Sequence, residues 1–190
     1  MKVAIITNFP PKTGIGNYSF QLFKELRKKV DVDLIFCSED RLRGSGVRNV
    51  TARRLPVFSK TLNAYFYYPN RIPEGYDIYH ITNQFLTRVL KYRKPGVITV
   101  QDLDAVRSKK YLPLLTRELQ KRSFRYLKNA AMIITTSEDS KKDIVKYLHA
   151  NKSKIVITPL GVDHGLFRKT DKKRARKKLG LPADKKIFNF

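Results

Sequence analysis

Two glycines near the amino terminus, Gly14 and Gly16, are spaced as in a phosphate-contacting segment. They follow a short apolar run, residues 3–6, and precede a segment whose apolar residues recur at three- and four-residue steps. Glycine lets backbone N–H groups approach a ligand closely, and the first turn of a helix leaves such groups unpaired. The order of strand, glycine loop (residues 8–16) and helix therefore favours an anion site, although plain loop geometry accounts for the two glycines equally well.

The same segment does not match the common nucleotide-binding motifs. In a G-x-G-x-x-G fingerprint the third glycine would stand at position 19, where this chain has Ser19. Glu39 lies at about the distance expected of an acid that binds a ribose, which leaves a nicotinamide-dependent enzyme as an open alternative. No G-K-S or G-K-T follows the glycines, so the segment is unlike a P-loop.

Seven apolar runs predict the strands that must position this segment. They are residues 3–6, 32–37, 50–55, 76–81, 97–100, 132–136 and 155–158. Amphipathic segments predict helices over residues 15–30, 83–92, 112–129 and 137–148. Alternating strands and helices predict an α/β fold with a doubly wound, mostly parallel, Rossmann-like sheet. Ligands of such sheets bind at the carboxyl ends of the strands.

The helix predicted over residues 112–129 has an apolar face and a basic face. Its inward side is expected to carry Leu112, Leu115, Leu119 and Leu127. Its outward side is expected to carry Arg117, Lys121, Arg122, Arg125 and Lys128.

Aromatic and basic residues are interleaved in residues 57–73. The rings are Phe58, Tyr65, Phe66, Tyr67 and Tyr68, and the cations are Lys60 and Arg71, with Arg53 and Arg54 nearby. Rings beside cations suit the stacking of a sugar or a base, or contact with a lipid interface. The alternative is that these rings cover the edge of the sheet as part of the core.

Positive charge is the most unusual property of the composition. The 190 residues include 40 Lys and Arg against 16 Asp and Glu, a formal net charge of +24. This excess attracts an anionic partner, which could be nucleic acid, acidic lipid head groups or phosphorylated sugars, unless it only solvates the surface. Hydrophobic residues make up 42% of the chain, enough for a folded core.

Cysteine and histidine usage predicts neither a disulfide nor a metal site. Cys37 is the only cysteine, and His80, His149 and His164 lie far apart in the sequence. His80 is expected to be a hydrogen-bonded histidine of the sheet. No apolar run has the length of a membrane span, and the first run ends at Asn8, too early for a signal peptide. We therefore expect a soluble, cytoplasmic protein.

The composition changes after Phe167. Residues 168–186 are strongly basic and predict a linker or helix, and residues 187–190 have the pattern of an opening strand. We expect a Rossmann-like domain over residues 1–167. Residues 168–190 are expected to be a basic linker and the first strand fragment of a further domain, so that the chain is a piece of a longer protein.

Five segments, in this order, resemble the amino-terminal domain of family 4 (group 1) retaining glycosyltransferases of the GT-B fold. They are TGIGNYSFQLFKEL, VITVQDL, AAMIITTSEDSKKDIVKYL, KIVITPLGVDHGLF and ARKKLGLPADKKIFNF. The resemblance implies transfer of a sugar from a UDP-, GDP- or ADP-linked donor with retention of the anomeric configuration. It also implies that no cofactor is tightly bound and that no metal is essential.

The resemblance implies roles for particular residues. The segment that would face the donor diphosphate is Gly14, Ile15, Gly16 and Asn17. Gln101 and Asp102 would lie at a strand end near the transferred sugar. Apart from the resemblance, contacts with the acceptor or at the domain interface are predicted for Tyr65, Tyr67, Arg71, Asn83 and Lys141.

Two positions depart from the family pattern. The family has histidine where this chain has Gln101, and a glutamine amide does not titrate near neutral pH, so any role that needs imidazolium is lost. Thr13 stands where the family often has another glycine.

The partners implied are a nucleotide-sugar donor, a sugar or lipid-linked acceptor, an anionic membrane surface and a carboxyl-terminal donor domain of the same chain. The enzyme would be cytoplasmic and peripheral at the inner face of the membrane. Because the family's clamp on the donor phosphates lies in that second domain, the 190 residues alone are expected to be inactive. The alternative is a basic Rossmann-like module that binds nucleic acid without catalysis. The sequence has no RNP-like strand and no KH-type loop, so no specific nucleic acid is expected.

Overall fold

The computed structural model describes residues 1–55, 58–103, 112–165 and 167–187. The chain forms two compact units, Met1–Pro159 and Leu160–Phe190, and each is described by itself. The first unit contains the sheet and the candidate site.

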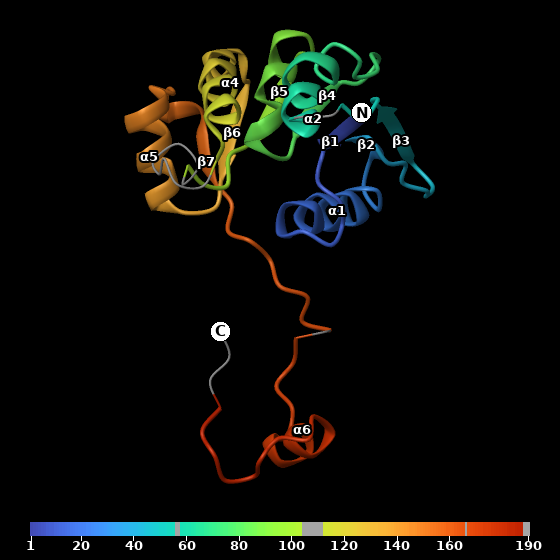
Figure 1. The fold of residues 1–190 in the computed structure, drawn as a ribbon, viewed down its shortest axis with the longest axis vertical. Coiled ribbons are helices and arrows are strands. Elements are labelled where there is room, and N and C mark those ends of the chain that lie inside the picture. Colours follow the sequence, from blue (N-terminus) through green and yellow to red (C-terminus); the bar gives the residue numbers. More distant parts are fainter. Residues whose placement is uncertain (56–57, 104–111, 166, 188–190) are drawn as a thin grey trace. The chain divides into compact units, whose positions relative to one another are not determined.

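A seven-stranded parallel sheet forms the centre of the first unit (Figure 1). Its strands are β1 (Lys2–Thr7), β2 (Asp31–Ser38), β3 (Val47–Thr51), β4 (Ile78–Ile81), β5 (Gly96–Thr99), β6 (Met132–Thr135) and β7 (Ile155–Ile157). Their spatial order is β3-β2-β1-β4-β5-β6-β7. The direction of winding reverses between β1 and β4, which is the switch point of a doubly wound sheet. The predicted α/β, Rossmann-like fold is confirmed.

Helices of three kinds connect the strands. The α-helices are α1 (Gly14–Leu26), α2 (Ser59–Leu62), α4 (Leu114–Phe124) and α5 (Glu138–Leu148), with α6 (Lys172–Lys178) in the second unit. The 3₁₀ helices are η2 (Gln84–Lys91), η3 (Arg125–Asn129) and η4 (Lys152–Lys154), and η1 (Asn63–Tyr67) is a π-helical turn that continues α2. In Figure 1, α1 lies on one side of the sheet and α2 and α4 lie on the other.

Both faces of β1 are buried, which explains why its sequence shows no polar alternation. Val3 and Ile5 pack with Phe23 of α1 in one hydrophobic cluster. Ala4 and Ile6 belong to the larger cluster, which includes η1, η2 and α4 residues. Successive side chains of a strand point to opposite faces, so one short run supplies both layers of the core.

The third strand begins earlier than predicted. The sequence predicted residues 50–55, whereas β3 pairs residues 47–51 with residues 34–38 of β2. β3 is an edge strand, so Arg48 can remain partly exposed and form an ion pair with Asp33, with 2.9 Å between Nε and Oδ2. A search for apolar runs misplaces a strand of this kind.

Two predicted helices also differ from the structure. The helix predicted over residues 83–92 is the 3₁₀ helix η2, with non-helical dihedrals at Leu86. The helix predicted over residues 112–129 is α4 followed by η3. The buried face of α4 differs from the predicted one. Leu115, which was expected to point inward, is 37% exposed, whereas Leu119 and residues 120, 123 and 124 are buried. The prediction used only the leucine positions, and it missed this face because two of the buried residues are polar.

The second unit contains the basic helix α6. Its N-cap is Asp171, whose Oδ1 accepts a hydrogen bond from the Arg174 backbone N–H at 2.8 Å. Of the strand predicted over residues 187–190, Ile187 lies in no strand and residues 188–190 lie outside the described residues. None of the helices in the described part of the chain is long and apolar enough to span a bilayer.

Candidate functional site

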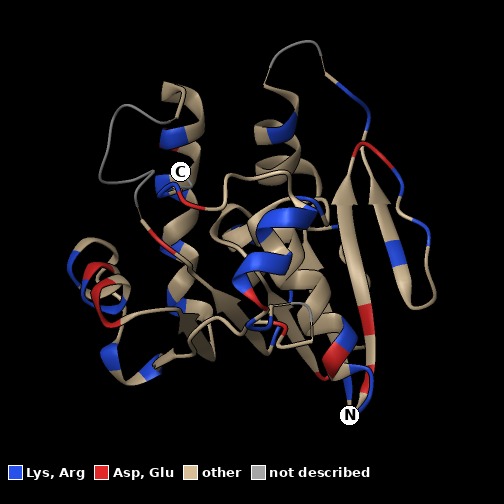
Figure 2. Ribbon diagram, turned by 90° about the horizontal axis from the view of Figure 1, so that it is seen from below, with Lys and Arg blue, Asp and Glu red and all other residues tan. Residues whose placement is uncertain are grey.

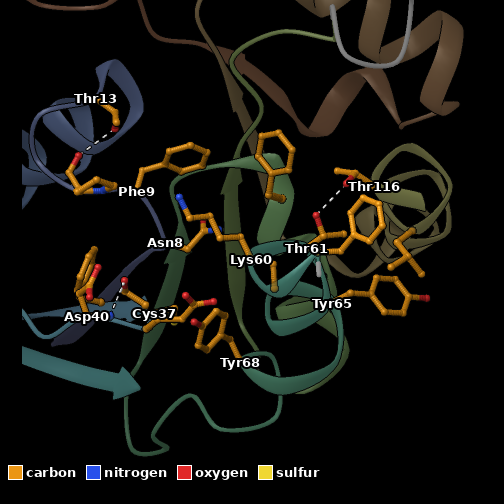
Figure 3. A pocket seen from close by; sticks show the side chains of 18 of the residues that line it. Asn8, Phe9, Thr13, Cys37, Asp40, Lys60, Thr61, Tyr65, Tyr68 and Thr116 are labelled. Carbon is orange, nitrogen blue, oxygen red and sulfur yellow. Dashed lines mark hydrogen bonds between the residues drawn. The ribbon is translucent and has the colours of Figure 1, made fainter. Parts of the chain in front are cut away.

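A cavity of about 670 Å³ lies at the carboxyl ends of β1 and β2 (Figure 3). Its walls come from the loop after β1, the end of β2, α2 with η1, and one side of α4 along its length. Phe9, Phe85, Tyr65 and Tyr68 supply aromatic surface. The cavity adjoins the switch point between β1 and β4, where ligands of open α/β sheets bind.

The glycine segment is the first turn of α1 and not a loop. The sequence predicted a loop through Gly16, but α1 begins at Gly14, so residues 14–17 are helical. Thr13 is the N-cap: its Oγ1 accepts the Gly16 N–H at 3.0 Å and donates to the Pro10 carbonyl at 2.9 Å. The threonine that departs from the family pattern therefore starts the helix.

The two glycines differ in what surrounds them. A Cβ built on Gly16 would lie 1.9 Å from the carbonyl oxygen of Pro10, so the fold itself requires glycine at this position. A Cβ built on Gly14 would meet no atom within 4 Å. Of the two, Gly14 has the open surface that a ligand could approach.

Hydroxyl groups fasten α1 to the sheet. Ser19 Oγ lies 2.7 Å from Thr82 Oγ1, directly after β4, and donates to the Ile15 carbonyl at 2.8 Å. Tyr18 OH lies 3.2 Å from Thr99 Oγ1 on β5. Ser19 occupies the place of the third glycine in a dinucleotide fingerprint, and here it bonds α1 to the sheet edge instead of allowing a closer approach.

His80 is a buried residue of β4, and its Nε2 lies 2.9 Å from Thr99 Oγ1. Burial lowers the pKa of His80 from 6.5 to about 4, because the imidazolium form would lose its hydration. The ring is therefore neutral at neutral pH. The predicted hydrogen-bonded histidine of the sheet is confirmed.

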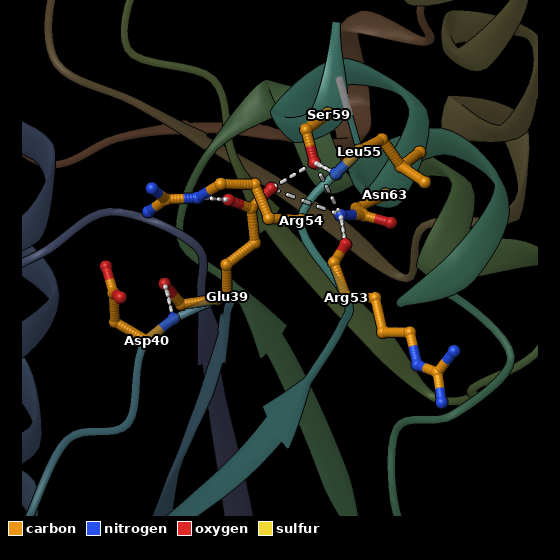
Figure 4. Close-up of polar contacts among 8 residues, drawn as sticks. Glu39, Asp40, Arg53, Arg54, Leu55, Ser59 and Asn63 are labelled. Atoms are coloured by element: carbon orange, nitrogen blue, oxygen red, sulfur yellow. Dashed lines mark hydrogen bonds and ion pairs between the residues drawn. The ribbon is translucent and has the colours of Figure 1, made fainter. Parts of the chain in front are cut away.

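Glu39 is held by its own chain (Figure 4). Its Oε1 accepts hydrogen bonds from the Ser59 hydroxyl and, at 3.3 Å, from Asn63 Nδ2, and its Oε2 accepts from Arg54 Nε at 3.1 Å. The Ser59 hydrogen bond, aided by Arg54, lowers the pKa of the Glu39 carboxyl below its usual value. Oε1 therefore anchors α2 and η1, and Oε2 holds Arg54, which argues against the ribose role of the nicotinamide alternative.

Gln101 and Asp102 follow β5 at the same edge of the sheet but do not line the cavity. The Gln101 carbonyl accepts from Ser140 Oγ at 3.1 Å and from Thr136 Oγ1 at 3.3 Å, which ties this strand end to the start of α5. The Gln101 amide nitrogen is buried and has no hydrogen-bond partner in the described part of the chain. The Asp102 carbonyl accepts from Gln84 Nε2 at 3.3 Å.

The five residues predicted for acceptor or interface contacts are not brought together. Tyr65 lines the cavity, and the Arg88 guanidinium lies 4.4 Å from its ring centroid. Tyr67 and Arg71 form a separate pair, with 3.9 Å between the guanidinium and the ring centroid. Asn83 is fully buried and caps η2, since its Oδ1 accepts the amide hydrogen two residues later at 3.0 Å.

The remaining member of that set, Lys141, lies on α5 and is not part of the cavity wall. Some rings of the aromatic segment belong to the core, and others are exposed, so each of the two predicted roles holds for part of the segment. Tyr65 and Tyr68 are buried, whereas Phe58 and Phe66 are exposed.

Several residues of the cavity wall were not predicted. They are Asn8, Phe9, Phe85, Thr116, Gln120 and Ser123. Asn8 and Phe9 directly follow a predicted strand, which would have been a usable indication. Thr116, Gln120 and Ser123 recur at four- and three-residue steps, so they share one face of the predicted helix.

The described residues of the site offer neither a cluster of metal ligands nor a reactive thiol. Among the described residues, no group of three or more His, Cys, Asp or Glu side chains could hold a metal ion. Cys37 lines the cavity but is buried, and burial raises the pKa of its thiol. The thiol is therefore protonated at neutral pH and a poor nucleophile.

A parallel Rossmann-like sheet with a cavity beside its switch point is typical of an α/β ligand-binding domain. Residues 12–166 match the model of one family, Glycosyltransferase Family 4. The chain belongs to Glycosyltransferase Family 4.

Curated relatives match a short part of the chain. The chain is 36% identical over 61 residues to a D-inositol 3-phosphate glycosyltransferase of Mycolicibacterium paratuberculosis, which covers 32% of this chain and 14% of that protein. It is 34% identical over 61 residues to the protein of the same name from a Nocardioides species, covering 32% of this chain and 13% of that one.

Solved structures share the fold at low identity. Anabaena Alr3699/HepE in complex with UDP superposes with a TM-score of 0.58 at 13% identity, over 94% of this chain and 50% of that one. Its complex with UDP-glucose gives a TM-score of 0.59 at 13% identity, over 95% and 50%. The chain thus spans half the length of these structures and a smaller part of the curated relatives.

Proposed function

We propose that this chain is the acceptor-side domain of a retaining glycosyltransferase that uses a nucleotide sugar. The observation that carries the proposal is the cavity at the carboxyl ends of β1 and β2 in a chain that belongs to Glycosyltransferase Family 4. The first turn of α1 faces the donor diphosphate, with Gly14 as the point of close approach. The UDP and UDP-glucose bound by Alr3699/HepE support a nucleotide-sugar donor for the whole protein.

In this proposal the site residues have distinct roles. The backbone N–H groups of residues 14–17 and the positive end of α1 interact with the donor phosphates. Gln101 and Asp102 lie near the transferred sugar, and Gln101 contributes its unpartnered amide N–H as a neutral donor. The cavity holds the acceptor, with Tyr65 in its wall. The other residues predicted for this role contact the second domain or stabilise the elements that do. They are Tyr67, Arg71, Asn83 and Lys141.

The acceptor is a sugar or a lipid-phosphate-linked sugar. The net charge of +24 supports an anionic acceptor or an anionic membrane that carries it, with the enzyme peripheral at the cytoplasmic face. The relatives named as glycosyltransferases of D-inositol 3-phosphate support a phosphorylated acceptor.

Nucleotide-sugar turnover by the full-length protein tests the proposal. Incubation with UDP-, GDP- and ADP-glucose should release nucleoside diphosphate from one of the three, and proton NMR of the product should show the anomeric configuration of the donor. The 190-residue chain alone should release none, because the family's phosphate clamp lies in a second domain. Turnover by the 190 residues, or an inverted product, would contradict the proposal.

A further inference from the structure

One face of α4 presents polar side chains to the cavity. Thr116, Gln120 and Ser123 recur at four- and three-residue steps and all line the cavity wall. The inward face of a helix is ordinarily apolar. We call these three residues the α4 polar face.

Two members of the α4 polar face are buried without hydrogen-bond partners. Gln120 is 6% exposed, and neither its amide nitrogen nor its amide oxygen has a partner among the described residues. Ser123 is 2% exposed, and its hydroxyl has none. Thr116 is bonded across the wall to Thr61, with 2.8 Å between the hydroxyl oxygens (Figure 3). Unpaired buried polar groups destabilise a fold, so their presence in a cavity indicates a ligand that completes them.

A further unpartnered group comes from the loop after β1. The buried side-chain oxygen of Asn8 has no partner within the described ranges, and Asn8 lines the same cavity. Together the cavity offers donors at Gln120 and Ser123 and acceptors at Gln120 and Asn8. A hydroxyl group donates and accepts at once, so it matches this mixed set.

The unpartnered groups are all uncharged, which distinguishes hydroxyl from phosphate. A buried phosphate requires cations or several converging N–H groups to replace its hydration. Arg41 and Lys60 are cations of the cavity wall. Both are exposed, which places them near the opening of the cavity. A charged part of an acceptor would lie at that opening and its neutral part inside.

Aromatic rings complete the match to a polyol. Phe9 and Phe85 lie with 5.7 Å between ring centroids, and Tyr65 and Tyr68 add further ring surface. The C–H face of a sugar ring can pack on such surfaces while its hydroxyls reach polar groups.

We propose that the α4 polar face and Asn8 form a hydroxyl-recognition site that binds an uncharged sugar or polyol ring of the acceptor. This rests on the proposed function and goes beyond it, because it assigns the acceptor's neutral ring to named side chains. Gln120 is the central residue, since one amide supplies both a donor and an acceptor.

Ligand-observed NMR on the full-length protein tests the site. The probes are D-glucose, D-mannose, D-galactose, myo-inositol and glucose 6-phosphate. At least one neutral probe should bind, and Gln120→Leu should weaken its binding roughly tenfold or more, with a smaller loss for Ser123→Ala. Gln21→Leu is the matched control, because Gln21 is exposed on α1. Equal binding by wild type and Gln120→Leu would overturn the proposal, as would binding of the phosphorylated probe alone.

Thermal unfolding of the same variants separates recognition from folding. Leu fills about the volume of Gln and removes an unpaired buried amide, so Gln120→Leu should raise the melting temperature while binding falls. A lower melting temperature with unchanged sugar binding would show that the amide bonds to the protein or to a fixed water, and the proposal would be wrong. Ser123→Ala gives a second test if Gln120→Leu fails to fold.

Donor turnover distinguishes failure of the site from failure of the proposed function. Hydrolysis of the nucleotide sugar in the absence of acceptor is measured on the wild-type protein and should persist in Gln21→Leu, because Gln21 is exposed on α1 and does not line the cavity. A wild-type protein that turns over a donor but binds no neutral ring overturns only the hydroxyl site. A wild-type protein that neither binds nor turns over any nucleotide sugar overturns the proposed function.

Discussion

Gly14 and Gly16 differ in how strictly the fold requires glycine at each position. At Gly16 a Cβ would collide with the Pro10 carbonyl, and at Gly14 it would enter open space. Gly16→Ala should therefore destabilise the fold by about 2 kcal/mol, because the loop backbone must move. Gly14→Ala should leave stability unchanged or raise it by about 0.5 kcal/mol, since alanine favours the helix. Urea unfolding of both variants measures the two effects.

Activity of the Gly14→Ala variant then tests the donor role. If α1 contacts the donor phosphates, this stable variant should bind or turn over nucleotide sugar more weakly than wild type, because the Cβ would occupy the open surface. Wild-type donor affinity in Gly14→Ala would contradict the donor contact. Equal stability losses for Gly14→Ala and Gly16→Ala would contradict the packing difference.

His80 predicts a pH dependence of stability. Its folded pKa of about 4 lies below the ordinary 6.5, so the unfolded state takes up a proton first as pH falls. The contribution of His80 is complete above pH 6.5 and is lost as pH falls from 6.5 to about 4, with a total of about 3 kcal/mol. Urea unfolding at a series of pH values should show a shallower decline for His80→Gln than for wild type. Parallel curves would show that His80 does not titrate in this window.

At the scale of elements, the Glu39 carboxylate joins the region after β2 to α2. It receives hydrogen bonds from Ser59 and Asn63 and an ion pair from Arg54. Glu39→Gln should cost about 1–2 kcal/mol, because charge-assisted bonds become neutral ones. Hydrogen exchange should become faster in α2 and η1 before the rest of the chain. Asp40→Asn, which changes the exposed neighbouring acid, is the control; equal exchange in the two variants would refute the anchoring role.

The α4 helix shows how one element can serve the core and the site together. Phe124 packs in the hydrophobic core, while Leu119, Gln120 and Ser123 of the same inward side line the cavity. A purely structural helix would have apolar residues at these positions. The polar residues on the buried face do not contribute to the core in the way that apolar residues would. Binding of a ligand in the cavity accounts for their presence.

At the scale of the whole molecule, charge is the dominant property. Figure 2 shows Lys and Arg positions distributed over helices and loops, with fewer acidic positions among them. If this surface serves an acidic membrane, the protein should float with vesicles that contain phosphatidylglycerol and not with phosphatidylcholine vesicles. Each basic residue near the surface contributes about 1 kcal/mol, and added salt should release the protein by screening. Equal recovery on both kinds of vesicle would exclude a charge-driven membrane role.

Local sequence patterns predicted the architecture well because strands and helices follow short-range periodicity. The run at residues 3–6, buried on both faces, was sufficient to indicate a parallel sheet. The predicted His80 environment followed from the same strand pattern. The edge strand β3 was misplaced because one partner strand leaves its side chains exposed, so its hydrophobic pattern is weak.

The sequence by itself determined the α/β class, the order of elements and the family resemblance, since each depends on neighbouring residues. Only the tertiary structure decided which side chains share the cavity, because strand order brings Asn8 beside elements more than a hundred residues away. It also separated Tyr67 and Arg71 from Tyr65, which are close in sequence but face different surroundings. Side-chain direction within a helical turn, and not sequence distance, determined which of them reaches the ligand cavity.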